Sequence, residues 1–274
     1  MTSDKLGKQP SGWADAFPGH AYARATCALA QVELIKLFRD PTELFSRAIQ
    51  PVLWLAIFGQ VFSRVRGVPT GGASYLDFMT PGILAQSVLF SAIFYGISVI
   101  WEKDLGIVHK LLVSPANRGA LVLGKAIAAA FRGLVQTVVI YGIAWVMGVA
   151  INWSWLPILG VLLAVIAGSA IFSTFSLIIA CLVKTRERFM GIGQVLTMPL
   201  FFASNAIYPI AMMPTWLKFV ARINPLTYLV DALRGLMVLQ GPGAYPYFFD
   251  LGLMIAIFVV LLAVAAKLYP SLVQ

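Results

Sequence analysis

The sequence predicts an all-α polytopic membrane protein with six transmembrane helices. Of its 274 residues, 60% are hydrophobic and only 11% are charged, whereas a soluble domain has a charged fraction near one quarter. The stretches 78–100 and 133–183 contain no Asp, Glu, Lys or Arg at all. Because each charged side chain at the centre of a bilayer costs roughly 2.5–3.5 kcal/mol on insertion scales, such stretches indicate membrane spans.

The first forty residues precede any span. Residues 1–21 read as a cytoplasmic tail without the apolar core of a signal peptide. Residues 22–40 mix apolar and charged side chains at three- and four-residue spacings and end near Asp40 and Pro41. This pattern predicts an interfacial amphipathic helix, which either anchors the chain at the membrane surface or binds a partner.

Each crossing of the hydrocarbon core, ~30 Å thick, needs about 20 apolar residues. The uncharged stretch 133–183 is too long for one helix, and it breaks at Asn152–Pro157, where Trp and Pro are typical of a membrane surface. Pro199, Pro209 and Pro214 mark kinks or an early end of the fifth span. The predicted spans are 44–62, 78–100, 133–151, 156–183, 189–211 and 247–266.

The distribution of basic residues orients these spans. With the N-terminus inside, fifteen Lys and Arg residues lie in cytoplasmic segments and five lie outside, namely Arg64, Arg66, Lys218, Arg222 and Arg234. This asymmetry places both termini in the cytoplasm. Cys27 and Cys181 then lie on or near the cytoplasmic side, where disulfides are rare, so both are expected to be free.

Two further segments lie outside the predicted spans. Residues 101–118 form a charged island between the second and third spans, longer than a simple connector requires. Residues 212–240 lie outside yet are too apolar for a solvated loop, and they predict two short helices, with Asn224 as N-cap and Pro225 in the first position of the second. We expect a re-entrant helical hairpin that protein buries. Asp231 and Arg234, three residues apart, are expected to form a local ion pair within it.

Four motifs in this order resemble a known family. They are Tyr-Leu-Asp-Phe-Met-Thr-Pro-Gly (75–82), the island from Trp101 to Arg118, Ile-Tyr-Pro-Ile-Ala-Met-Met-Pro-Thr-Trp (207–216) and Asn-Pro-Leu-Thr-Tyr-Leu-Val-Asp-Ala-Leu-Arg-Gly (224–235). Together they are similar to the type-2 ABC exporter permeases, the group that contains daunorubicin-resistance and nodulation-factor export subunits. The chain departs from the family pattern in the middle of the island, at Val108, His109 and Lys110.

The resemblance implies a permease subunit of the bacterial cytoplasmic (inner) membrane, without a catalytic site or cofactor of its own. No phosphate-binding Gly-x-x-x-x-Gly-Lys-Ser/Thr loop occurs in the sequence, so ATP and Mg²⁺ would be held by a P-loop ATPase in two copies, joined to two copies of the permease. The island would be the coupling helix that docks on the ATPase. The residues expected to make this contact are Glu102, Lys103, Asp104, Leu105, Ile107, Val108, Leu111, Leu112, Ser114, Pro115 and Arg118.

The resemblance also implies a substrate path along the first, second and fifth spans. The candidate residues are Trp54, Phe58, Phe90, Phe94, Tyr95, Gln194, Met198, Phe201, Phe202 and Asn205. Aromatic and Met side chains suit an amphipathic, lipid-linked or drug-like cargo, although for any single residue ordinary helix packing or lipid contact is the simpler explanation. The residues Pro209, Asn224, Pro225, Asp231 and Arg234 are assigned a structural role in the re-entrant segment.

Other functional classes have weaker support. His20 and His109 lack further ligands at metal-binding spacing, so no metal site is expected. The net charge of +9 follows from membrane topology, and no nucleic-acid partner is expected. An ion-coupled secondary carrier would commonly show internal repeats and intramembrane charges, which the second to fifth predicted spans lack. A membrane scaffold or receptor without transport activity remains the other alternative.

Overall fold

The computed structural model describes residues 49–63, 72–108, 118–183, 185–239, 241 and 243–269, with six further positions between 26 and 39. This part of the chain is almost entirely helical and contains no β-strand, only one isolated antiparallel bridge between Ile151 and Val238. The predicted tail 1–21 and the middle of the predicted island, residues 109–117, lie outside the described residues. Of the expected interfacial helix 22–40, only Thr26, Cys27, Gln31, Val32, Ile35 and Arg39 are described, each in helical conformation.

Among the described residues, four helices are long and apolar enough to cross a membrane. They are α4 (Tyr75–Asp104), α6 (Arg118–Val146), α7 (Trp155–Leu182) and α11 (Tyr247–Leu268). Helices also occur where the first and fifth spans are predicted. The described part of the first is Ile49–Phe62, which includes the π-helical segment η1 (Trp54–Gly59) and α3 (Gln60–Phe62), and the other is the shorter helix α8 (Arg186–Phe202). The all-helical class is therefore confirmed, whereas the six-span count stays a prediction.

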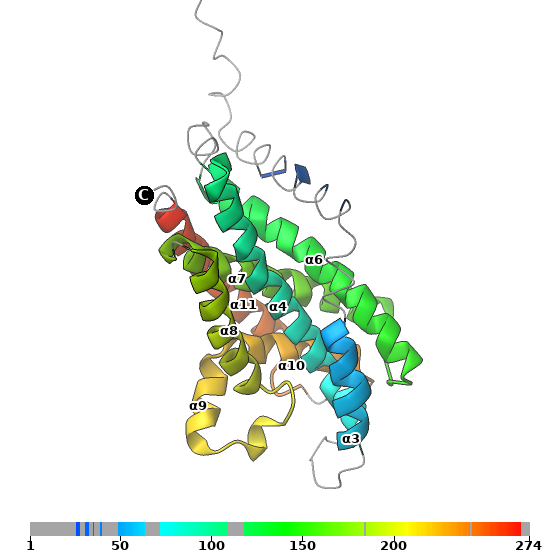
Figure 1. The fold of residues 1–274 in the computed structure, drawn as a ribbon. Coiled ribbons are helices and arrows are strands. Elements are labelled where there is room, and N and C mark those ends of the chain that lie inside the picture. The colour runs from blue at the N-terminus through cyan, green and yellow to red at the C-terminus, as the bar shows by residue number, and fades with distance from the viewer. Residues whose placement is uncertain are drawn as a thin grey trace, which may run out of the picture.

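Helix α7 is the centre of the bundle and contacts α4, α6, α10 and α11. Its contact with α4 depends on small side chains, as in many membrane helix pairs. A Cβ atom added at Gly96 would lie 2.1 Å from the Ser176 Oγ, and the Ser176 hydroxyl donates to the carbonyl of Ile93. Figure 1 shows α4 running between α6 on one side and α8 on the other, so that α4 contacts most of the bundle.

Helix α6 begins earlier than the predicted third span, 133–151. It starts at Arg118, so the end of the predicted island is already helical. The predicted span began only at Gly133 because Lys125 and Arg132 before it are charged, but both side chains are buried against α4. Charged residues can continue a helix toward the membrane when neighbouring helices supply partners.

Helix α8 ends earlier than the predicted fifth span, 189–211. The helix stops at Phe202, and the chain then turns through residues 203–208. The backbone of Ala206 lies directly on α4 at Gly82, where an added Cβ would come within 2.3 Å of the Ala206 carbonyl oxygen. A glycine at this position admits a non-helical backbone, which explains why the helix is followed by a buried turn.

Two short helices follow this turn. Between α8 and α11 lie the 3₁₀ turn η2 (Ile210–Met212), α9 (Thr215–Ile223) and α10 (Pro225–Met237). Both helices lie within the segment 212–240 for which the sequence predicts two short helices, and α10 begins at Pro225 after Asn224, as expected. In Figure 1, α9 lies at the end of the bundle opposite the Asp104 end of α4, while α10 packs inside against α4, α7 and α11.

Candidate functional site

The cytoplasmic end of α4, by the predicted orientation, is joined to the start of α8 by one arginine. The Arg186 side chain donates from Nε and Nη2 to the same Asp104 carboxylate oxygen, at 3.1 and 2.6 Å. Its guanidinium also stacks on Trp101, with Cζ 3.7 Å from the ring centroid. The first residues of the predicted coupling segment are thus linked directly to the helix that occupies the place of the fifth span.

The four described residues after Asp104 differ in their exposure. Leu105 is 68% exposed and Ile107 is 39% exposed, whereas Val108 is only 1% exposed. Gly106, between the first two, has a φ of 70°, a conformation that few other residues adopt. Leu105 and Ile107 are therefore available to a partner, whereas Val108 packs in the protein's own core, and its expected contact with a partner stays a prediction.

The Glu102 side chain, expected at the docking surface, is also buried. Its carboxylate is buried and forms an ion pair with Lys125 of α6, at 2.6 Å. This pair joins the two helices that enter and leave the predicted coupling segment. Lys103 is half-buried. Leu111, Leu112, Ser114, Pro115 and the side chain of Arg118 lie outside the described part of the chain, so their docking role stays a prediction.

The candidate path residues fall into two groups. Trp54 and Phe58 of η1 stack with ring centroids 4.4 Å apart, and Trp54 meets Phe201 of α8 edge-on at 5.8 Å. Phe201 in turn contacts Phe202 at 5.4 Å. The structure thus brings together aromatic residues that are about 150 positions apart in the sequence and places them between the first apolar helix and α8.

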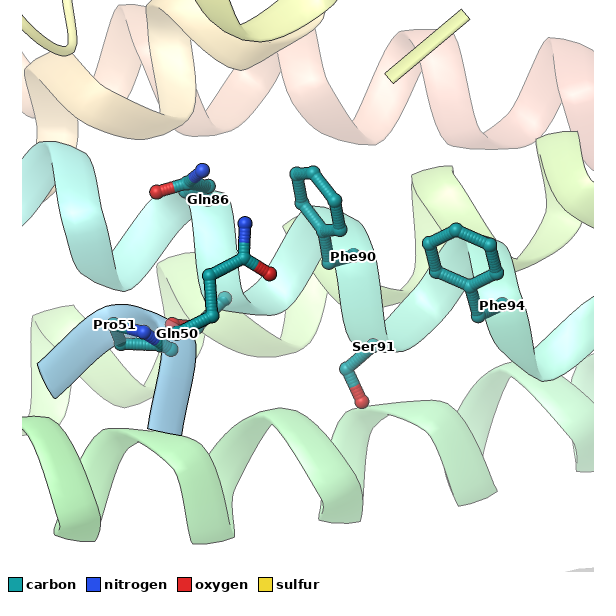
Figure 2. Close-up of a pocket in the computed structure, with 7 residues that line it drawn as sticks. Gln50, Pro51, Gln86, Phe90, Ser91 and Phe94 are labelled. Atoms are coloured by element: carbon teal, nitrogen blue, oxygen red, sulfur yellow. The ribbon is translucent and has the colours of Figure 1, made fainter. Parts of the chain in front are cut away.

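Phe90 and Phe94 form the second group, on α4, with ring centroids 6.0 Å apart. They line a pocket beside the start of the first apolar helix, shown in Figure 2. Met198 is half-buried and Gln194 is exposed on α8. The assignment of these four residues to a substrate path stays a prediction.

Tyr95 and Asn205 are both buried. The Tyr95 ring faces α6, where Arg132 stacks on it with Cζ 4.3 Å from the ring centroid and Lys125 lies 5.7 Å away. Asn205 is buried in the turn after α8, and its backbone carbonyl accepts a hydrogen bond from Arg234. Both residues lie in the protein's interior, and their place on the substrate path stays a prediction.

The predicted ion pair between Asp231 and Arg234 is wrong. The Arg234 guanidinium donates to the backbone carbonyls of Phe78 and Asn205 and stacks on the Phe78 ring at 3.8 Å. The Asp231 carboxylate instead accepts hydrogen bonds from the backbone N–H groups of Ala244 and Tyr245, at 2.8 and 2.9 Å. Each charged group has found backbone partners in a different segment, which a three-residue spacing cannot reveal.

Asn224, Pro225 and Pro209 keep the structural positions expected of them. The Asn224 side-chain oxygen accepts from the N–H of Leu226 and so caps α10, while its amide nitrogen donates to the carbonyl of Leu200 in α8. Pro225 is the first residue of α10, and Pro209 precedes η2 in an extended conformation. Asn224 therefore ties the end of α8 to the start of α10.

Several residues of this arrangement were not singled out from the sequence. Lys125, Arg132 and Gln86 are buried, and Arg186 clamps the end of α4. Charged residues beside apolar stretches are a usable signal for Lys125 and Arg132, whereas nothing in the local sequence distinguishes Gln86. Neither Cys27, which is exposed, nor Cys181, which is buried, forms a disulfide in the described part of the chain. No group of three His, Cys, Asp or Glu side chains suited to a metal ion occurs among the described residues.

Comparisons with known proteins agree with this architecture. A sequence profile described as ABC-2 type transporter matches residues 24–238. The chain is 30% identical to a putative transport permease, ycf38, of Cyanophora paradoxa over 204 residues, which covers 73% of this chain and 69% of the relative. It is 24% identical to the daunorubicin resistance ABC transporter permease protein DrrB1 of Streptomyces coeruleorubidus, covering 91% and 88% of the two chains.

Nodulation protein J of Bradyrhizobium diazoefficiens is a further relative, 25% identical over 242 residues that cover 84% of this chain and 87% of that protein. These relatives are named as permeases or as nodulation proteins, and they align with most of the helical bundle described above. The profile match spans well over half of the sequence. The chain therefore belongs to the ABC-2 type transporter family of membrane permeases.

Proposed function

We propose that this chain is the membrane subunit of an ATP-binding-cassette exporter, in which two permeases work with two copies of a separate P-loop ATPase. The observation that supports this most directly is the end of α4, where exposed Leu105 and Ile107 follow a segment clamped to both α6 and α8. A docked ATPase that moved residues 101–118 would move three helices together. Such a rigid linkage is what alternating access requires.

Replacing Leu105 and Ile107 together by alanine should weaken binding of the ATPase subunit. Exposed apolar side chains that become buried in an interface contribute about 1–3 kcal/mol when they act as hot spots. The double variant should insert normally into the membrane, lose part of the ATPase on co-purification and show reduced substrate-stimulated ATP hydrolysis. The measurement is the permease-to-ATPase ratio after affinity purification from the same membranes.

A matched control is Leu156 and Leu159, two exposed leucines near the start of α7, at the opposite end of the bundle. Their double alanine variant removes similar apolar surface and should leave ATPase binding unchanged. Equal losses in both variants, or no loss in either, would remove the end of α4 as the docking site.

The proposed orientation has a separate test. The fifteen-to-five distribution of Lys and Arg supports six spans with both termini in the bacterial cytoplasm. In a background without Cys27 and Cys181, a cysteine at Ser114 should stay protected from an impermeant thiol reagent in intact cells, while cysteines at Gly71 and Gly243 should be labelled. Labelling at Ser114 would overturn the topology.

The substrate we propose is amphipathic, lipid-linked or drug-like. Support comes from the aromatic contacts between η1 and α8 and from the name of the relative, a daunorubicin resistance permease. ATP-dependent transport into inverted vesicles that survives collapse of the proton gradient is expected. Transport driven by the gradient without ATP would favour the ion-coupled carrier, and no transport with either energy source would favour a scaffold.

A further inference from the structure

A small pocket lies between the first apolar helix and α4. Its volume is about 200 Å³, and its lining comes from Gln50 and Pro51 on the first helix and from Gln86, Ser87, Phe90, Ser91 and Phe94 on α4. Figure 2 shows the two glutamine side chains, one from each helix, at one end of this group and the two phenyl rings farther along α4. The pocket therefore has a polar end and an aromatic end.

The polar end contains an amide with no partner. Gln86 is only 3% exposed, and neither its amide nitrogen nor its amide oxygen makes a hydrogen bond. The adjacent Ser87 differs, because its hydroxyl donates to the carbonyl of Ile83 at 3.0 Å. Leaving a buried polar group without a partner is costly, so a ligand that hydrogen-bonds the Gln86 amide at the wall of this pocket would be favoured.

The depth of the pocket restricts how a ligand reaches it. Gln86 lies eleven residues after the start of α4 and eighteen before its end, which at 1.5 Å per residue is about 16 Å and 27 Å along the helix. Both distances place the amide within the hydrocarbon region of a bilayer. A ligand at this depth comes from the apolar phase or from a path through the protein.

The charge of the lining restricts the ligand further. None of the described lining residues is ionisable. Neither charged side chain of the neighbouring α4–α6 contact lines the pocket: Lys125 pairs with Glu102, and Arg132 stacks on Tyr95, although its Nε and Nη1 have no hydrogen-bond partner. A formally charged group would lack a counter-ion here, whereas a carboxamide can donate to and accept from a neutral hydroxyl or carbonyl group.

The pocket volume sets the size of the bound part. Sites for complete drug-sized ligands enclose about 300–1,000 Å³, more than the volume of about 200 Å³ found here. Only one end of a larger molecule fits. We propose that this pocket binds the neutral, ring-bearing end of the transported amphiphile, with Gln86 hydrogen-bonded to its hydroxyl or carbonyl group and Phe90 and Phe94 packed on its ring.

This assignment rests on the proposed transport of an amphipathic substrate, but its test needs neither ATP nor an ATPase. The full-length permease in phosphatidylcholine nanodiscs is dialysed to equilibrium against 2-naphthol or 2-methylnaphthalene, with empty nanodiscs subtracted. The two probes share a ring system and differ in the hydroxyl group. The native protein should bind 2-naphthol about five- to tenfold more tightly, the increment of one neutral hydrogen bond.

The Gln86→Leu variant should lose this preference while its binding of 2-methylnaphthalene and its melting temperature are maintained. Gln136→Leu is the matched control, because Gln136 on α6 is also buried with an unpartnered amide oxygen but does not line the pocket. The control should keep the preference for 2-naphthol. Maintained melting temperatures exclude misfolding as the cause of any loss.

An unchanged preference in Gln86→Leu, or an equal loss in Gln136→Leu, would overturn the assignment. So would equal drops in melting temperature for Gln50→Leu and Gln86→Leu without any probe preference in the native protein, because the two amides would then only bond each other. ATP-driven transport with no probe preference refutes the pocket alone. A Gln86-dependent preference without ATP-driven transport refutes the proposed function and leaves a neutral-ligand site.

Discussion

Replacement of Lys125 by methionine should lower the free energy of unfolding by about 3–5 kcal/mol, the range measured when one member of a buried ion pair is removed. Both side chains of the Lys125–Glu102 pair are nearly inaccessible, at 3% and 8% exposed. Without the lysine, the Glu102 carboxylate loses its cationic partner in a site with little water. Chemical unfolding in detergent, followed by far-ultraviolet circular dichroism, measures the loss.

The double variant Glu102→Leu with Lys125→Met should recover most of that stability, since neither member of the pair is then left as a buried charge without the other. The exposed pair of Asp104 and Arg186 is the matched comparison, because its side chains are 45% and 32% exposed. Asp104→Asn should cost less than about 1 kcal/mol. If the two single variants, Lys125→Met and Asp104→Asn, cost the same, burial is not what makes the inner pair important.

Replacement of Arg234 by leucine should cost about 2–4 kcal/mol of stability. The guanidinium is 3% exposed and donates to two backbone carbonyls in different segments, at 2.7 Å to Asn205 and 3.3 Å to Phe78. The variant leaves the Asn205 carbonyl, in a buried turn, without this donor, at about 1–3 kcal/mol. It also removes the stacking on Phe78, at about 0.5–2 kcal/mol. Arg234→Lys should recover only part, because an ammonium lacks the planar fork.

The charge exchange Asp231→Arg with Arg234→Asp should give no recovery over the single variants. The two side chains have separate partners, so a reversed pair would satisfy neither the carbonyl of Asn205 nor the N–H groups of Ala244 and Tyr245. Arg222→Leu, at an exposed position on α9, serves as a control and should change stability by less than about 0.5 kcal/mol. Recovery in the exchanged variant would contradict this prediction and show that the two side chains form a direct ion pair.

Local sequence signals predicted the helices well where local physics decides them. The predicted cap at Asn224 is formed by residues two positions apart, whereas the capping box of Ser74 and Asp77 at the start of α4 was not singled out from the sequence. Segment length and hydropathy located α4, α7 and α11 for the same reason. The end of α8 was missed because it depends on Gly82, more than a hundred positions earlier in the chain, which admits the backbone of Ala206.

The candidate site divides in the same way. The sequence indicated that residues 101–108 leave the membrane, but not that Val108 turns inward while Leu105 and Ile107 face outward. Hydrophobicity gives the depth of a residue, and a break at Gly106 changes the face that each following side chain presents. Aromatic residues on the first and fifth predicted spans were expected to share a path, and the contact between Trp54 and Phe201 shows only that they meet.

By itself, then, the sequence determined the membrane class, the order of the helices, the asymmetry of the basic residues and the family, since these depend on composition and on motifs within single segments. The tertiary structure alone decided which distant groups became partners. It paired Glu102 with Lys125, gave Asp231 and Arg234 different backbone partners, and left the amide of Gln86 unpaired at a pocket. The physical reason is that a buried polar group must be satisfied by whatever the neighbouring helix presents, and which helix becomes the neighbour is set by the packing of the whole bundle.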